Sequence, residues 1–337
     1  MVDYTKRNVV NGKLISSKKK RSRSSAKKNT IPAVRYLRYE LTNSSNAGTE
    51  TSHFVDLARD LSAINRRLMR QGRIYHVKRV TIVSKNTTNV TVFEPGTSFS
   101  GGRVSVSTIP ESWITIGAWK RGFSLFNEMH RRANAGVSGD IRGKWADFKV
   151  NMTTDFRTAT KLVPLDNGAN PLSLGEWNYS TFVTPDGTTS ADEFELQMLG
   201  NHTGVGQVSS VGLVKSYGES RATVGTDPTV PTDVSNDPLT NLFDDGTVYD
   251  EIMTITFAEG DEPPYSITDY PGDDANMPKP LVVQDGVISD GRLTFGGFTA
   301  MCGMLEFEST SPIASDVYSV LVELAPGKYR GIKADVI

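Results

Sequence analysis

The charges of this 337-residue chain are segregated along its length. Residues 1–160 carry 29 lysines and arginines against 11 acidic residues, a net charge of +18. Residues 161–337 carry 8 against 27, a net charge of −19. The formal net charge of −1 therefore hides two regions of opposite sign. This asymmetry predicts one surface that attracts a polyanion and another that repels it and keeps the protein in solution.

The positive charge is densest at the N-terminus. Residues 1–30, called the basic arm below, hold ten lysines and arginines against one acid, Asp3. Little in this segment can be buried, so the entropy lost on ordering is not offset, and we expect it to be disordered on its own. The cations expected to contact nucleic acid here are Lys18, Lys19, Lys20, Arg21, Arg23, Lys27 and Lys28.

The composition of the basic arm predicts contact with a nucleic-acid backbone, because each cation that neutralises a phosphate releases condensed counterions. No zinc-finger spacing, RNA-binding aromatic motif or leucine-zipper heptad follows it, so binding is expected to be indifferent to base sequence. Arg35 and Arg38, in the first predicted strand after the arm, complete the predicted interface. The alternative interpretation of the arm is a solvated tail or a nuclear import signal.

The rest of the composition excludes several classes of protein. A single cysteine, Cys302, rules out a disulfide framework and a cysteine-based zinc cluster. No apolar run reaches the roughly 18 residues that a membrane span needs, and the N-terminus lacks an apolar secretory region. The four histidines lack metal-ligand spacing, and no catalytic motif is present. We therefore expect no enzymatic activity, no cofactor and no membrane partner.

From residue 31 onward the sequence has the pattern of an antiparallel β protein. Residues 34–41 alternate, with Leu37, Tyr39 and Leu41 on one face. Further β-rich runs are predicted at residues 75–84, 89–93, 103–109, 145–152, 177–183, 194–199, 208–216, 248–257, 280–283, 292–299, 304–308 and 317–324. Many short strands with frequent Gly, Pro, Asn and Asp between them, and no βαβ alternation, indicate an all-β sandwich or barrel.

Two helices are predicted within this β-rich body. The first is expected to begin at Ser52 as its N-cap and to end at Gly72, with an apolar stripe that starts at Phe54. Its last turn would hold Arg66, Arg67 and Arg70, which complement the helix dipole. The second helix is predicted at residues 123–135.

The acidic half contains one segment of unusual composition. Residues 222–278 have thirteen acidic residues and no lysine or arginine, and they are rich in Pro and Thr. This predicts long surface loops around one or two short elements, forming a soluble acidic face. Clustered carboxylates also suit hard cations, so a calcium site at a subunit boundary stays open as an alternative, although no EF-hand spacing supports it.

The four tryptophans lie in or near the basic half of the chain, at Trp113, Trp119, Trp145 and Trp177. Large aromatic side chains dominate cores and subunit contacts, and we expect these four to serve there. The alternative is that they stack on unpaired bases, because aromatics beside lysine and arginine are typical of single-strand binding.

Three features together resemble one family of proteins. They are the Lys/Arg/Ser arm at residues 18–28, the Arg-containing first strand at 34–41, and the final strand with its tail at 318–331. A basic arm, an antiparallel domain with early helices and acidic loops resembles the single jelly-roll capsid proteins of small icosahedral viruses. The likeness is greatest to those of circular Rep-encoding single-stranded DNA viruses.

This resemblance implies a fold, a partner and a location. Residues 31–337 would form an eight-stranded antiparallel jelly roll with inserted short helices, and residues 222–278 would be an acidic insertion on the outer surface. The chain would self-assemble into an icosahedral shell, as a homo-oligomer. The arm would package nucleic acid, with single-stranded DNA favoured over RNA. The protein would be part of the virion and could pass through the host nucleus during assembly.

Two other classes of protein fit part of the sequence. A cellular, sequence-nonspecific nucleic-acid-binding protein would explain the arm but not a β-rich body of this length. A β-sandwich that binds or hydrolyses carbohydrate would explain the body but not the arm. The state of assembly separates the capsid interpretation from both of these, and a glycan or glycosidase screen would identify the last.

Overall fold

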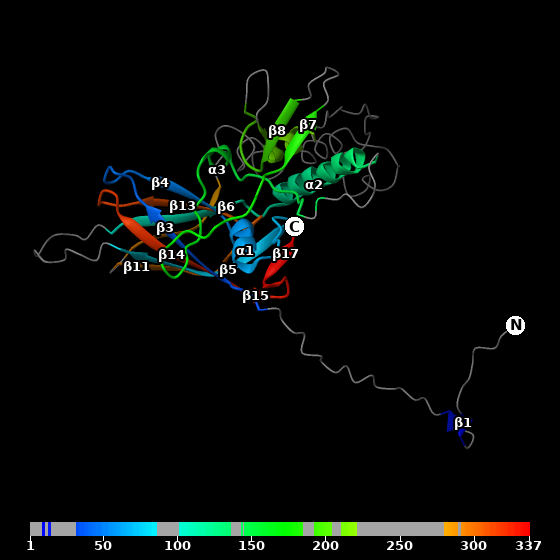
Figure 1. The fold of residues 1–337 in the computed structure, drawn as a ribbon, viewed down its shortest axis with the longest axis horizontal. Coiled ribbons are helices and arrows are strands. Elements are labelled where there is room, and N and C mark those ends of the chain that lie inside the picture. The colour runs from blue at the N-terminus through cyan, green and yellow to red at the C-terminus, as the bar shows by residue number, and fades with distance from the viewer. Residues whose placement is uncertain are drawn as a thin grey trace, which may run out of the picture.

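A computed structural model describes residues 9–10, 13–14, 32–85, 101–135, 143, 145–184, 192–203, 210–220, 280–288 and 291–337. The described part of the chain is dominated by antiparallel β-sheets, which confirms the predicted β-rich class. Two large sheets form the layers of a sandwich, and a second lobe with the longest helix lies beside them (Figure 1).

The two layers are built from strands that lie far apart in the sequence. The six-stranded sheet contains β3 (Tyr36–Thr42), β5 (Arg73–Ser84), β11 (Arg292–Phe295), β12 (Phe298–Met301), β14 (Val317–Leu324) and β17 (Ala334–Val336). Its main order is β11-β5-β14-β3, and β12 and β17 pair with β5. The four-stranded sheet contains β4 (Thr51–Asp56), β6 (Arg103–Thr108), β10 (Leu281–Val287) and β13 (Met304–Thr310), in the order β10-β6-β13-β4.

The first core lies between these two sheets. The alternation of β3 places Leu37, Tyr39 and Leu41 in it, fully buried, as the sequence predicts. The facing strands contribute branched and aromatic side chains, among them Val104 of β6 and Phe307 of β13. Because side chains from both sheets belong to one buried cluster, the hydrophobic effect holds the layers together.

The first helix is shorter than predicted. Helix α1 spans Leu57–Asn65, and the residues before it form β4. Asp56, not Ser52, is the N-cap, because its carboxylate accepts a hydrogen bond from the Arg59 backbone N–H. The predicted end at Gly72 is also wrong, since the chain leaves the helix at Arg66 with a left-handed φ of 51°.

The second lobe is formed by chain that lies between strands β6 and β10. It contains α2 (Trp113–Ala133), α3 (Thr154–Thr158), α4 (Leu213–Glu219) and a small sheet of β7 (Thr181–Thr184), β8 (Asp192–Gln197) and β9 (Ser210–Gly212). Helix α2 begins well before the predicted start of 123, behind a capping box formed by Ser112 and Thr115. Phe148 lies at the centre of its core and contacts Trp119, Phe126 and Phe182.

One predicted strand of this lobe does not form. Residues 145–152 run without a β-ladder, apart from an isolated bridge at Asn151. Side chains satisfy the backbone here: Ser180 accepts from the Lys149 N–H, and Gln71 accepts from the Val150 N–H. Part of the 208–216 run is helical, as α4.

Short pairings complete the fold. Strands β1 (Val9–Val10) and β2 (Lys13–Leu14) pair within the arm, and β15 (Pro326–Gly327) pairs with β16 (Gly331–Ile332) after the last long strand. The predicted strands at 89–93 and 248–257 and the acidic segment 222–278 lie outside the described residues. In the remainder, no helix is long and apolar enough to cross a membrane.

Candidate nucleic-acid interface

The residues that follow the basic arm lie at the C-terminal end of helix α1. The Val34 N–H donates to the Asn65 side-chain oxygen at 2.8 Å, and the Asn65 amide donates back to the Val34 carbonyl at 3.0 Å. One residue later, the Arg35 carbonyl accepts from the Leu324 N–H at 2.8 Å. The arm therefore enters the folded body at the end of α1.

The predicted contact residues fall into two groups. Lys18, Lys19, Lys20, Arg21, Arg23, Lys27 and Lys28 lie outside the described residues. Arg35 is half-buried beside the clamp formed by Val34 and Asn65. Arg38, on β3, is paired with Glu40 at 3.3 Å, so part of its charge is already compensated.

Five arginines follow the clamp in the loop after α1, on β5 and in the C-terminal segment, and the sequence indicates three of them only as cations of a helix end. The basic cluster comprises Arg66, Arg67, Arg70, Arg73 and Arg330. Tyr329 organises it: the guanidinium of Arg73 lies 4.2 Å from the centre of the Tyr329 ring, and the Arg70 N–H donates to the Tyr329 hydroxyl at 3.0 Å. Arg330 donates to the Leu68 carbonyl. The cluster thus joins the loop after α1 to the C-terminal segment.

The geometry of the loop after α1 follows from its backbone. Arg66 adopts the left-handed conformation, which turns the chain at the helix end, and its N–H donates to the Ser62 carbonyl. The Ser62 hydroxyl accepts from the Met69 N–H at 2.7 Å and donates to the Ala58 carbonyl at 2.6 Å. These bonds fold the loop back, so its arginines surround the helix end instead of extending its last turn.

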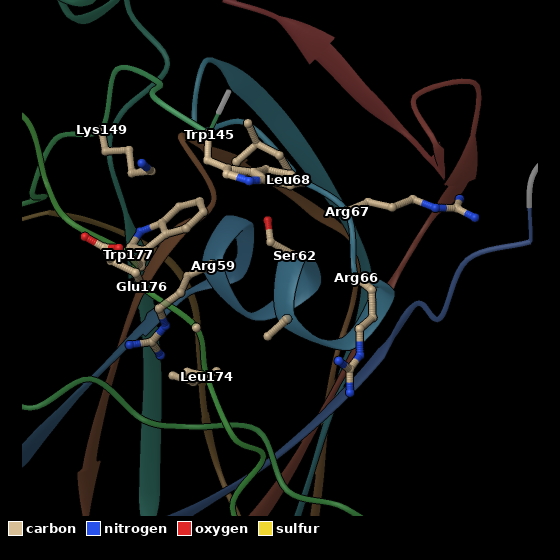
Figure 2. A pocket seen from close by; sticks show the side chains of 12 residues that line it. Arg59, Ser62, Arg66, Arg67, Leu68, Trp145, Lys149, Leu174, Glu176 and Trp177 are labelled. Carbon is tan, nitrogen blue, oxygen red and sulfur yellow. The ribbon is translucent and has the colours of Figure 1, made fainter. Parts of the chain in front are cut away.

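A pocket opens beside α1 next to this cluster (Figure 2). It is lined by Arg59, Ser62, Ala63, Arg66, Arg67, Leu68, Trp145, Lys149, Leu174, Gly175, Glu176 and Trp177. Among these described lining residues four are cationic and one is acidic, so the pocket favours an anion. Two indoles, those of Trp145 and Trp177, form part of its wall.

Lys149 is the most unusual side chain of the pocket. It is only 7% exposed, and its ammonium lies 4.8 Å from the centre of the Trp177 ring, a cation–π distance. Burial lowers the pKa of Lys149, while the charge of Asp147 acts in the opposite direction. Among the described residues, no hydrogen bond or ion pair to this ammonium is found.

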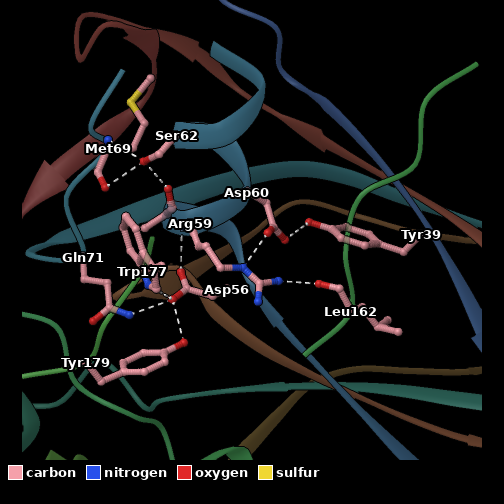
Figure 3. A network of polar contacts seen from close by, with 11 residues as sticks. Tyr39, Asp56, Arg59, Asp60, Ser62, Met69, Gln71, Leu162, Trp177 and Tyr179 are labelled. Atoms are coloured by element: carbon pink, nitrogen blue, oxygen red, sulfur yellow. Dashed lines mark hydrogen bonds and ion pairs between the residues drawn. The ribbon is translucent and has the colours of Figure 1, made fainter. Parts of the chain in front are cut away.

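A buried polar network holds the Trp177 wall in place (Figure 3). Asp56 is fully buried, and one of its carboxylate oxygens accepts three hydrogen bonds. The donors are Gln71 at 2.9 Å, the Trp177 indole N–H at 3.0 Å and the Tyr179 hydroxyl at 3.1 Å. The network therefore fixes the orientation of the indole, because rotation of the ring would leave a buried carboxylate oxygen with fewer donors.

Arg59 faces a different carboxylate. Its Nε donates to Asp60 at 2.8 Å, and its guanidinium also donates to the Leu162 carbonyl. Asp60 further accepts from the Tyr39 hydroxyl at 2.7 Å. Burial raises the pKa of Asp60 to about 7, and the charge of Arg59 opposes this rise. Arg59 is thus engaged within the fold, which leaves Lys149, Arg66 and Arg67 as the other cations of the described pocket lining.

Within the described residues, no group of three or more His, Cys, Asp and Glu side chains could hold a metal ion. The calcium site kept open for residues 222–278 falls outside those residues. Of the four tryptophans, Trp119 is buried as expected and Trp177 is half-buried, whereas Trp113 and Trp145 are 55% and 61% exposed.

Comparison with known proteins identified no relative of this chain: no family model, no curated protein and no solved structure matches it.

Proposed function

We propose that this protein is a shell-forming viral capsid protein whose body is a single jelly roll and whose basic arm packages nucleic acid. The observation that carries the proposal is the pairing order of eight strands. In chain order these are β3, β4, β5, β6, β10, β11, β13 and β14. The first pairs with the last, the second with the seventh, the third with the sixth and the fourth with the fifth.

This order is that of a long double-stranded ribbon folded into two sheets. The ribbon closes because the eighth strand also pairs with the third and the seventh with the fourth. Two four-stranded layers joined in this way support a jelly roll, an arrangement common in viral capsid and lectin domains.

Charge distribution supports the capsid interpretation. The residues that follow the basic arm pack on the end of α1, directly before the first arginine of the basic cluster, so cations of the folded body lie near the point where the arm ends. An inward-facing basic region would neutralise a packaged genome, and the acidic C-terminal half would contribute to the outer surface. Neutralising the genome would reduce repulsion between subunits and so couple packaging to assembly.

Exposed apolar side chains at a sheet edge support self-association. Strand β10 ends the four-stranded sheet, and in the described residues Leu281, Val282 and Val287 are each about half exposed. An apolar edge of this kind is a typical subunit contact in closed symmetric assemblies, where weak contacts are repeated many times.

Carbohydrate binding is the second candidate, favoured by the two indoles in the pocket. The cations that surround them argue for an anionic ligand instead. Electron microscopy of the purified full-length protein, with and without single-stranded DNA, separates the candidates. Closed particles of uniform radius support a capsid protein. A protein that stays monomeric under all conditions and binds glycans in an array overturns the proposal.

A further inference from the structure

The pocket beside α1 has the chemistry of a nucleotide site. We propose that it binds one nucleotide of single-stranded nucleic acid, with the base against the indoles of Trp145 and Trp177 and the phosphate at Lys149. This inference rests on the proposed packaging function and assigns one specific contact to it. The pocket has a volume of about 190 Å³, far more than the ~15 Å³ that one water molecule needs on this measure, so it has room for an organic group.

Lys149 supplies the first argument. This residue is only 7% exposed, and its ammonium lies over the Trp177 ring at the pocket. No hydrogen bond from this ammonium to a described residue is found, so its N–H groups can donate to a ligand. A phosphate oxygen in the pocket would accept a charge-assisted hydrogen bond from it.

The indoles supply the second argument. Single-strand binding sites combine cations that follow the backbone with aromatic faces on which bases stack. Trp177 is oriented by its hydrogen bond to Asp56, so its ring is held before a ligand enters. Trp145 is exposed at the pocket and therefore accessible to a base. Paired bases of a duplex do not offer their faces in this way, which restricts the ligand to single strands.

The position of the pocket supplies the third argument. The clamp between Val34 and Asn65 brings the end of the basic arm to the helix from which Arg59 and Ser62 line the pocket. A strand that the arm holds by its phosphates would therefore pass the pocket. An acidic peptide would satisfy the cations but would leave the indoles without a planar partner, so nucleic acid is the better match.

The test uses the full-length protein and the dinucleotide pdTdT, which is too short to engage many cations of the arm. Binding is followed by quenching of tryptophan fluorescence and by calorimetry. Trp145→Ala and Lys149→Met should weaken binding about tenfold, as expected when one stacking or one charged interaction is removed. The matched controls are Trp113→Ala, which removes another exposed indole, and Lys120→Met, on the exposed side of α2; both should stay within about twofold of wild type.

Weaker binding by a variant could result from a folding defect, whereas tighter binding could not, so the test includes a variant that is expected to bind more tightly. Glu176 is exposed and is the acidic member of the described pocket lining, so it opposes an incoming phosphate. Glu176→Gln should tighten pdTdT binding several-fold. The thermal unfolding midpoint of each variant is recorded, and Lys149→Arg should retain most of the affinity that Lys149→Met loses.

Two results overturn the pocket assignment. One is equal pdTdT binding by Trp145→Ala and Trp113→Ala. The other is a wild-type protein that binds a poly-glutamate peptide in the pocket but not pdTdT. Affinity for a 30-nucleotide strand and particle formation are measured in parallel, because they depend on the arm and the body. If these persist while the pocket assignment fails, the proposed function stands; if wild-type protein forms no particles, the proposed function fails separately.

Discussion

Asp56 accepts a hydrogen bond from the Trp177 indole N–H at 3.0 Å, across 121 residues of sequence. The same carboxylate caps helix α1 through the Arg59 N–H. One buried side chain therefore begins the helix that lines the pocket and orients an aromatic wall of that pocket. The fold of the sandwich and the geometry of the candidate site depend on each other at this residue.

Replacing this carboxylate should destabilise the protein strongly. Asp56→Ala leaves the donors of Gln71, Trp177 and Tyr179 without their acceptor and removes the helix cap. We expect the free energy of unfolding to fall by about 3 kcal/mol or more, measured by denaturant titration. Asp166→Ala is the control, because Asp166 is exposed and should cost about 1 kcal/mol or less. Equal losses in the two variants would contradict the role assigned to Asp56.

Asp60 should make stability fall as the pH rises. Burial raises its pKa to about 7 from an ordinary value of 3.8, so the folded state keeps a proton that the unfolded chain releases. The contribution of this group to the free energy of unfolding is therefore largest near pH 4 and declines toward pH 7, by at most about 1.4 kcal/mol per pH unit. Denaturant titrations at about pH 5 and pH 7 should show wild type losing stability relative to Asp60→Asn.

The control for this measurement is Asp285, whose pKa the hydrogen bond from Arg103 lowers from its ordinary value of 3.8. The contribution of Asp285 to the free energy of unfolding is present above pH 3.8 and is lost only at more acidic pH. Between about pH 5 and pH 7, the free energy of unfolding of Asp285→Asn should therefore change by the same amount as that of wild type. If wild type gained stability relative to Asp60→Asn as the pH rose over this window, the assignment for Asp60 would be wrong.

The packing of Tyr318, on β14, against the start of β6 leaves no space for a side chain at Gly102. A Cβ built there would lie 1.8 Å from the Tyr318 hydroxyl oxygen. Gly102→Ala should therefore lower the free energy of unfolding by about 1–3 kcal/mol, through displacement of a buried tyrosine. Gly296→Ala, where a Cβ meets nothing within 4 Å, is the matched substitution and should change the unfolding midpoint little. A neutral Gly102→Ala would show that the two strands pack less closely than described.

Much of the sandwich can be predicted from local patterns, and the site cannot. The alternation of Leu37, Tyr39 and Leu41 is visible in sequence because a strand buried on one face repeats every second residue. The predicted start of α1 is wrong because the apolar spacing at Phe54 fits a helix as well as a strand. The carboxyl of Asp56 is the signal that could have placed it, since aspartate is a preferred N-cap.

The pocket depends on contacts between residues that are distant in sequence. Lys149 and Trp177 come together across the second lobe, and Arg330 reaches Leu68 from the other end of the chain. Neither contact is predicted by a sequence motif or by the spacing of a helix or strand. The sequence shows Arg66, Arg67 and Arg70 near a helix end and predicts that they belong to its last turn. Only the structure shows that helix α1 ends at Asn65, so that these arginines lie in the loop beyond it, where they can bind a ligand.

Removal of the basic arm should separate binding from folding. Deletion of residues 1–31 leaves the clamp between Val34 and Asn65 intact, so thermal unfolding of the remaining chain should stay cooperative. Its affinity for a 30-nucleotide strand should fall, and the slope of log K against log salt should become shallower by about 0.7 for each phosphate that the arm no longer neutralises. Equal slopes for the intact and shortened proteins would eliminate the arm as the main source of binding.

We propose that this chain closes into a shell around nucleic acid. Electron microscopy of the full-length protein mixed with single-stranded DNA, followed by averaging of particle images, tests it most directly. We expect closed particles of one radius that contain nucleic acid. A population that remains monomeric across protein concentration, salt and added DNA would contradict it.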